Sequence, residues 1–305
     1  MTQSQIKSEI DLPKLIERYG SEDKCHAYLE ELRWPDGVKC PRCGSDKISR
    51  IKTRRQFDCD GCRYQFSVRV GTVLQDSKLP LWKWFLAVYM MGESKKGVSA
   101  NQLKRMLGVS YKTAWFLCHR IRSAMVQGAG PLTGTVEIDE TYHGGKRRGK
   151  GKGYIANKTM IVGAVQRGGE LRVKAIPSNK KLNHKLSREF VAEHVADDAE
   201  FIYTDESPGY PDLTDWNTKH RRVNHQKEEW VNGDIHTNTV ESAWSLFDRA
   251  VIGSYHKLSV KHLNAYLDEF AYRFNNRDNP FLFRDTILAL VEADALTFAD
   301  LTSAS

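Results

Sequence analysis

The sequence predicts a multidomain α+β protein, and three features of the chain support this prediction. Two Cys-x-x-Cys pairs lie near the start, and a helical stretch interrupted by a glycine turn follows them. From Gly134 onward, apolar and polar residues alternate as they do in strands. We expect a helical lead at residues 1–37, a cysteine-rich domain at 38–70, a helix-turn-helix at 78–128, a mixed α/β core at 132–290 and a tail at 291–305.

The composition points to a basic protein that binds a polyanion. The 305 residues include 46 Lys and Arg against 38 Asp and Glu, which gives a net charge of +8. Such a balance favours a partner such as nucleic acid. The first residues lack the apolar run of a signal peptide, and no apolar stretch is long enough to span a bilayer. We therefore expect a cytoplasmic, nucleoid-associated protein without a membrane partner.

Helices are expected within the first 35 residues, because apolar side chains recur there at helical spacing. A break near Gly20 divides this pattern into two parts. The residues that carry it are Leu12, Leu15, Ile16 and Tyr19, and then Tyr28, Leu29 and Leu32.

The cysteine-rich domain carries the most specific local pattern. Cys40-Pro-Arg-Cys43 is followed, after fifteen residues, by Cys59-Asp-Gly-Cys62. Four thiolates at this spacing suit a tetrahedral structural zinc, and the segment resembles a zinc ribbon. We expect one strand at 48–57 and another at 64–68. The alternative, a redox dithiol, is typical of a βαβ context, which this stretch does not show.

A helix-turn-helix is expected after the cysteines. Residues 81–91 form an apolar helix, and the next two helical stretches are joined by Gly108-Val-Ser110. Ser110 would cap the last helix, whose first residues, Tyr111, Lys112 and Thr113, would face a DNA major groove. Its core-facing residues would be Ala114, Leu117 and Ile121. Many small helical units share this turn, so a unit that does not bind DNA is the alternative.

Other basic residues are candidates for phosphate contacts. In the cysteine-rich domain these candidates are Lys52, Arg54 and Arg55. In the basic, glycine-rich loop at 146–153 they are Lys146, Arg147 and Arg148. An ordinary solvated surface is an equally good interpretation for any one of the first three.

The segment from 135 onward is expected to place two aspartates at strand ends. Residues 135–141 form a strand that carries Asp139, and residues 200–204 form a strand that ends at Asp205. Between them we expect a hairpin of 159–166 with 170–176, turning at Gly168-Gly169, and a helix at 186–195.

A late helix adds a third carboxylate. Its apolar stripe comprises Val240, Trp244, Phe247 and Val251. Asn238 is the expected N-cap, and Glu241, three residues on, completes a pattern like a capping box. Capping alone would explain Glu241. Two strand-end aspartates and one helix carboxylate, however, are typical of a two-metal phosphodiester site.

Four motifs together resemble a known family. They are Glu137-Ile-Asp-Glu-Thr-Tyr-His-Gly-Gly-Lys146, Thr204-Asp-Glu-Ser-Pro-Gly-Tyr210, His236-Thr-Asn-Thr-Val-Glu-Ser242 and Phe274-Asn-Asn-Arg277. In this order, and after a four-cysteine ribbon, they resemble the DDE transposases of bacterial insertion sequences that carry an N-terminal zinc ribbon. The resemblance extends from about residue 20 to about residue 280.

The resemblance implies an RNase H-like core at 132–290 that cleaves and transfers DNA strands with Mg²⁺ or Mn²⁺. The catalytic triad would be Asp139, Asp205 and Glu241, which would hold two ions. Hydrolysis would free a 3′-hydroxyl at the element end, and this hydroxyl would then attack target DNA. The implied partners are double-stranded DNA, as terminal inverted repeats and as target, and further copies of the chain in a synaptic complex.

Neighbours of the triad have other expected roles. Side chains alternate along a strand, so Glu140 would face away from Asp139, and Glu137 would be a reserve ligand on the same face. Asn238 would support the site as a cap. Related sequences often carry a Lys seven residues after the final Glu, whereas this chain has Asp248. DNA contacts at that place would then fall to Arg249 or Lys257.

Two other functions compete with an active transposase. One is a DNA-binding protein derived from a transposase, with an inactive core, which Asp248 would favour. The other is a zinc-ribbon transcription factor, which leaves the three spaced carboxylates unexplained.

Overall fold

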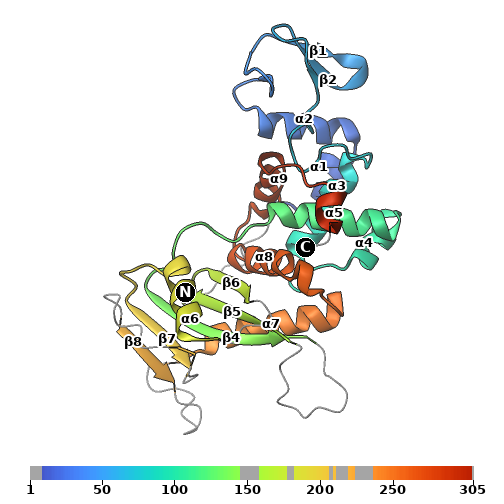
Figure 1. The fold of residues 1–305 in the computed structure, drawn as a ribbon. Coiled ribbons are helices and arrows are strands. Elements are labelled where there is room, and N and C mark those ends of the chain that lie inside the picture. The colour runs from blue at the N-terminus through green and yellow to red at the C-terminus, as the bar shows by residue number, and fades with distance from the viewer. Residues whose placement is uncertain are drawn as a thin grey trace. The chain divides into compact units, whose positions relative to one another are not determined.

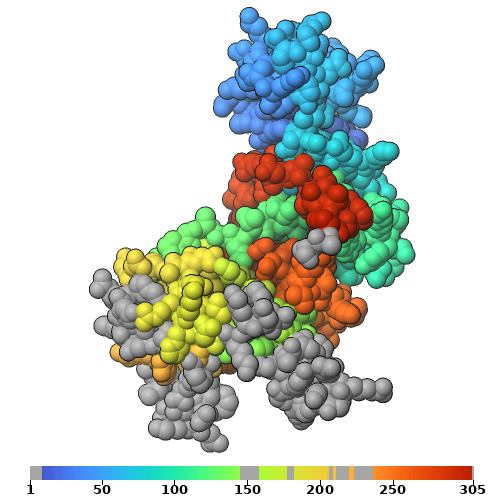
Figure 2. Space-filling model, viewed as in Figure 1, coloured from blue at the N-terminus to red at the C-terminus, as the bar shows by residue number. Residues whose placement is uncertain are grey.

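The computed structural model of the protein describes residues 9–144, 158–176, 182–205, 209–210, 219–223 and 236–303. The chain forms two compact units (Figure 1). Unit 1 contains residues 1–125 and 276–305, and unit 2 contains residues 126–275. In unit 1, Figure 2 shows the C-terminal segment, in red, against residues drawn in cyan and green.

Unit 1 begins with the two predicted helices. Helix α1 spans Leu12–Tyr19 and α2 spans Glu22–Arg33, and they are separated at Gly20 as the sequence indicates. Each helix begins at a side chain that accepts a hydrogen bond from the first turn, Asp11 in α1 and Ser21 in α2. The helices expected within the first 35 residues are therefore confirmed, and residues 1–8 of the expected helical lead lie outside the described residues.

The cysteine-rich part of unit 1 folds as an antiparallel sheet of order β1-β2-β3, with strands Ile48–Ile51, Gln56–Cys59 and Gln65–Phe66. The predicted single strand at 48–57 is wrong. A 3₁₀ turn, η1 (Lys52–Arg54), and a left-handed Arg55 (φ 49°) reverse the chain in its middle. The reversal lets Ile48 pair with Cys59 and so brings the two cysteine pairs together.

The predicted helix-turn-helix is present. Helix α3 spans Leu81–Glu93, α4 spans Ala100–Leu107 and α5 spans Tyr111–Ala124. Gly108 ends α4 in the left-handed region (φ 60°), where a Cβ would be strained, and the Ser110 hydroxyl accepts from the Thr113 backbone N–H. The residues expected to face the core are buried, namely Ala114, Leu117 and Ile121.

The chain after Asn275 returns to unit 1. Helix α9 (Leu282–Glu292) packs on α2 and α3, and α10 (Phe298–Thr302) packs on α5. Phe283 of α9 packs in the aromatic core of unit 1, because its ring centroid lies 5.7 Å from those of both Tyr19 and Phe85. The expected core boundary at 290 therefore differs from the observed unit boundary, and part of the expected tail is helical.

Unit 2 contains a sheet of order β6-β5-β4-β7-β8. The strands β4 (Thr135–His143), β5 (Thr159–Gln166) and β6 (Leu171–Ile176) are antiparallel, and β7 (Phe201–Asp205) and β8 (Lys219–Val223) run parallel to β4. The predicted hairpin and the strand that ends at Asp205 are confirmed. Because β4 and β7 are parallel neighbours, they carry Asp139 and Asp205 toward the same edge of the sheet.

Helices cover both faces of this sheet (Figure 1). Helix α6 (His184–His194) packs on one face; α7 (Asn238–Ala250) and α8 (Leu263–Asn275) pack on the other. A π-helical segment, η3 (Val251–Tyr255), and a 3₁₀ turn, η4 (Val260–His262), connect α7 to α8. This arrangement confirms the predicted mixed α/β core.

Helix α7 lies close to β5 because Gly163 has no side chain. A Cβ placed at Gly163 would lie 2.5 Å from the ring of Trp244. Gly163 is also the residue of β5 that pairs with Asp139 of β4. The glycine therefore sets how near α7 approaches the strand that carries Asp139.

We expect Gly163→Ala to lower the stability of the protein by about 1–3 kcal/mol, because the added methyl group overpacks the contact with Trp244. Urea unfolding measures this change. Gly253→Ala is the matched control, since its Cβ would meet nothing within 4 Å. Equal midpoints for the two variants would contradict the packing argument.

Candidate functional site

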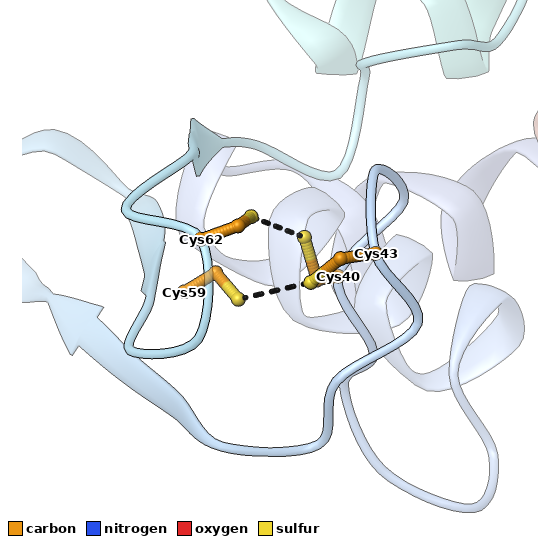
Figure 3. A group of neighbouring side chains, drawn as sticks. All are labelled: Cys40, Cys43, Cys59 and Cys62. Atoms are coloured by element: carbon orange, nitrogen blue, oxygen red, sulfur yellow. Dashed lines mark hydrogen bonds between the residues drawn. The ribbon is translucent and has the colours of Figure 1, made fainter.

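The four cysteines form a compact cluster in unit 1. Their sulfur atoms all lie within 4.8 Å of one another (Figure 3). Cys40 Sγ lies 3.7 Å from Cys62 Sγ, and Cys43 Sγ lies 3.5 Å from Cys59 Sγ. Four sulfurs arranged tetrahedrally around zinc at about 2.3 Å would lie about 3.8 Å apart. The cluster therefore fits a closed tetrahedral metal site.

A second cluster consists of carboxylates in unit 2. Among the described residues, Asp139, Glu140 and Asp205 place one oxygen each within 4.8 Å of one another. Asp139 and Glu140 lie on β4, and Asp205 is the last residue of β7. The two predicted aspartates are therefore brought together, as the strand-end argument anticipates. Hard oxygen donors gathered in this way suit Mg²⁺ or Mn²⁺.

The expectation for Glu140 is wrong. Strand alternation places it on the opposite face from Asp139, yet its carboxylate belongs to the same cluster. The Tyr210 hydroxyl donates to Glu140 Oε2 at 2.8 Å. The longer Glu side chain can extend around the strand, so the alternation rule, which describes Cβ directions, does not fix where its carboxylate ends.

Asp139 is the carboxylate of the cluster whose pKa its surroundings change most clearly. Burial is the largest cause that raises its pKa to about 7, and the negative charges of Glu140, Asp205 and Glu241 contribute to this rise. A bound cation would reverse this effect, because it favours the ionised carboxylate. The donor set and its repulsion together fit a divalent metal site.

Glu241 approaches the cluster from α7. It lies in the first turn, where its Oε1 accepts a hydrogen bond from the Thr237 hydroxyl at 3.0 Å. Its charge affects the pKa of Asp139, although its oxygens lie outside the 4.8 Å cluster of the other three. The predicted capping box is wrong: Thr237 is the N-cap, and Asn238 is the first helical residue.

Glu137 does not join the carboxylate cluster. Its side chain is fully buried (0% exposed), and its oxygens contact residues at the start of α7. The expectation that Glu137 is a reserve metal ligand rested only on its position on the same strand face as Asp139.

The candidate DNA contacts of unit 1 lie on its surface. Lys52, Arg54 and Arg55 are exposed around η1, and Arg55 forms an ion pair with Asp23. Tyr111 is exposed at the start of α5. Beside it, Lys112 Nζ lies 4.4 Å from the centroid of the Phe298 ring, so the C-terminal helix α10 covers part of this predicted groove-facing surface.

In unit 2, Arg249 and Lys257 are exposed, and Arg249 donates to the Ser245 hydroxyl at 2.8 Å. Asp248 is also exposed. The candidates Lys146, Arg147 and Arg148 lie outside the described residues. Within the described part of the chain, no helix has the length and apolarity needed to cross a membrane.

Comparisons with known proteins match the two regions of the chain that contain these clusters. A model of the transposase zinc-ribbon domain matches residues 20–65, and a model of the ISXO2-like transposase domain matches residues 131–275. One relative, described as an uncharacterized protein in transposable element ISH50 of Halobacterium salinarum, is 32% identical over 279 residues. That match covers 85% of this chain and 92% of the relative.

Solved structures give weaker matches. The Mos1 strand transfer complex is 12% identical, covers 68% of this chain and 75% of its own, and has a TM-score of 0.30. A pre-cleavage Mos1 transpososome is also 12% identical, with coverages of 70% and 79% and a TM-score of 0.27. At such TM-scores these likenesses carry no argument about this chain.

The family is established by the relative that matches most of both chains, and by domain models that coincide with the cysteine ribbon and with the sheet unit. The acidic motifs lie on β4, on β7 and at the start of α7 within the second matched region. The chain therefore belongs to the insertion-sequence transposases that combine an N-terminal zinc ribbon with an ISXO2-like DDE transposase domain.

Proposed function

We propose that this transposase cleaves DNA strands at the ends of its element and joins them to target DNA. In this proposal Asp139, Asp205 and Glu241 hold two divalent metal ions, Mg²⁺ or Mn²⁺. The observation that carries it is the convergence of Asp139 and Asp205 from adjacent strand ends, with the charge of Glu241 reaching Asp139 from α7. When bound, the ions would activate the attacking water or 3′-hydroxyl and stabilise the leaving oxygen.

The protein's own residues orient these carboxylates. The Thr237 hydroxyl donates to Glu241 and restricts its rotation, and the Tyr210 hydroxyl does the same for Glu140. Glu140 is thus a further candidate ligand that the structure adds to the triad. Oriented acceptors need little reorganisation when a cation binds, which favours binding at a defined place.

DNA is the substrate that the charge and the family support. We propose that Tyr111 and Lys112 at the start of α5 contact a major groove, and that Lys52, Arg54 and Arg55 on the ribbon contact phosphates. In unit 2, Arg249 and Lys257 are the proposed contacts near Glu241. A synaptic complex holds two element ends, so we propose that the chain acts as a homo-oligomer.

The ribbon is proposed to bind one structural zinc ion through Cys40, Cys43, Cys59 and Cys62. The site is closed, since the thiolates fill all four positions of a tetrahedron. Phe57 and Phe66 are both buried beside the cysteines, and Trp34 packs against their rings at 5.4 Å and 6.0 Å. A core this small depends on the metal for its stability.

We expect Cys43→Ser to abolish stoichiometric zinc binding and to unfold the ribbon, because three thiolates leave the tetrahedral site open. Zinc content of the purified protein and tryptophan fluorescence, to which Trp34 on the ribbon core contributes, report the two effects. Cys25→Ser is the control, since that thiol lies outside the cluster. A native protein that holds no zinc would contradict the assignment.

We expect Asp139→Asn and Asp205→Asn each to reduce strand cleavage by about a hundredfold or more, because metal-assisted charge stabilisation is worth several kcal/mol. The assay uses DNA that carries the inverted repeats flanking this gene, with Mg²⁺ or Mn²⁺. Glu193→Gln is the control: this exposed carboxylate on α6 pairs with Lys174 and should leave cleavage unchanged.

The same assay separates the competing functions. Repeat-specific DNA binding without cleavage by the native chain would favour the DNA-binding protein with an inactive core. DNA binding unchanged after loss of all three carboxylates, together with no cleavage, would favour a zinc-ribbon transcription factor.

A further inference from the structure

We propose that Glu137 is a positioning residue of this site: it holds the first turn of α7 so that Glu241 approaches Asp139. The inference rests on the proposed function, in which Glu241 is a metal-binding carboxylate. From the sequence alone, Glu137 is a reserve metal ligand. Its complete burial and its absence from the carboxylate cluster argue against that role and for an indirect one.

The contacts of Glu137 are those of a helix cap supplied by another element. Its Oε2 accepts from the backbone N–H groups of Thr239 and Val240 at 2.8 and 3.1 Å, and its Oε1 accepts from the Thr239 hydroxyl at 2.9 Å. First-turn N–H groups of a helix have no intrahelical acceptor, and the N-cap Thr237 provides none from its side chain. A carboxylate also suits the positive end of the helix dipole.

Arg167 compensates the buried charge of Glu137. Its Nε donates to Glu137 Oε1 at 2.7 Å, and its Nη2 donates to the His236 carbonyl at 3.0 Å. The Arg167 guanidinium also lies 4.7 Å from the centroid of the Tyr203 ring on β7. One Arg–Glu pair therefore connects β4, the end of β5 and the segment that enters α7, and it gives the buried carboxylate a charged hydrogen-bond partner.

The position of this pair links the two halves of the active site. Glu137 precedes Asp139 by two residues on β4, and Val240, which it holds, directly precedes Glu241 on α7. The strand that presents one catalytic carboxylate thus fixes the turn that presents the other. Trp244, one turn further along α7, packs at Gly163 and makes a shift of the helix costly.

A purely structural role predicts different behaviour from a positioning role. If Glu137 only stabilised unit 2, its loss would lower stability and act independently of Glu241. If it positions Glu241, its effect on metal binding should vanish when Glu241 has already been removed, because coupled residues are not additive.

The test is a double-mutant cycle of Glu137→Gln and Glu241→Gln, with Mn²⁺ affinity measured by calorimetry and strand cleavage measured in parallel. We expect Glu137→Gln to weaken Mn²⁺ binding about ten- to hundredfold, as loss of a ligand-orienting partner does. Affinity for repeat DNA should stay within about twofold. The double variant should bind Mn²⁺ no more weakly than Glu241→Gln alone.

Three further variants control for folding and grade the effect. Glu269→Gln removes another fully buried carboxylate of unit 2, which accepts from the Tyr255 hydroxyl at 2.7 Å, and should leave Mn²⁺ affinity unchanged. Thr239→Ala deletes a single donor to Glu137 and should give a smaller loss, which Thr239→Ser should restore. If Glu137→Gln does not fold, the two Thr239 variants still test the positioning role of Glu137.

The outcomes are distinguishable. Native Mn²⁺ affinity in Glu137→Gln, or losses that add in the double variant, would overturn the positioning role while leaving the proposed function intact. Native affinity and cleavage in Glu241→Gln would instead overturn the assignment of Glu241, and with it the positioning role. Faster hydrogen exchange of the first-turn amides of α7 in Glu137→Gln, beside unchanged exchange in α8, is the supporting structural readout.

Discussion

The packing of α7 onto the sheet is the contact on which the rest of the proposed site depends. Trp244 lies against Gly163, and Gly163 pairs with Asp139 across β4 and β5. This close approach of helix and sheet accompanies the effect of the Glu241 charge on the pKa of Asp139. The apolar stripe of α7 supplies the driving force, since Val240, Trp244 and Phe247 are all buried in the core on that face.

This packing holds together groups that repel one another. The raised pKa of Asp139 reflects its burial beside Glu140 and Asp205, a local arrangement that opposes folding in the absence of a cation. Burial of the apolar clusters on both faces of the sheet, and ion pairs such as Glu137 with Arg167, offset the unfavourable free energy of these buried carboxylates. Functional sites commonly conflict with local stability in this way.

Sequence reasoning succeeded where a local rule controls the outcome. Helix periodicity located α1 to α5, Gly108 and Ser110 marked the turn, and thiol spacing identified the ribbon. It failed where a side chain or a segment responds to distant partners. The single strand expected at 48–57 is divided at the left-handed Arg55, and the expected tail contains α10, whose Phe298 packs on Phe116.

The sequence by itself determined the parts: four thiols in two pairs, two strand-end aspartates and a helix glutamate, because each depends on spacing within a short segment. Only the tertiary structure decided the partners of the remaining carboxylates. Glu140 lies in the cluster and accepts a hydrogen bond from the Tyr210 hydroxyl. Glu137 lies outside it and accepts hydrogen bonds from the backbone N–H groups of Thr239 and Val240 on α7. Both outcomes depend on residues about 70 to 100 positions away, and side-chain alternation along one strand carries no information about them.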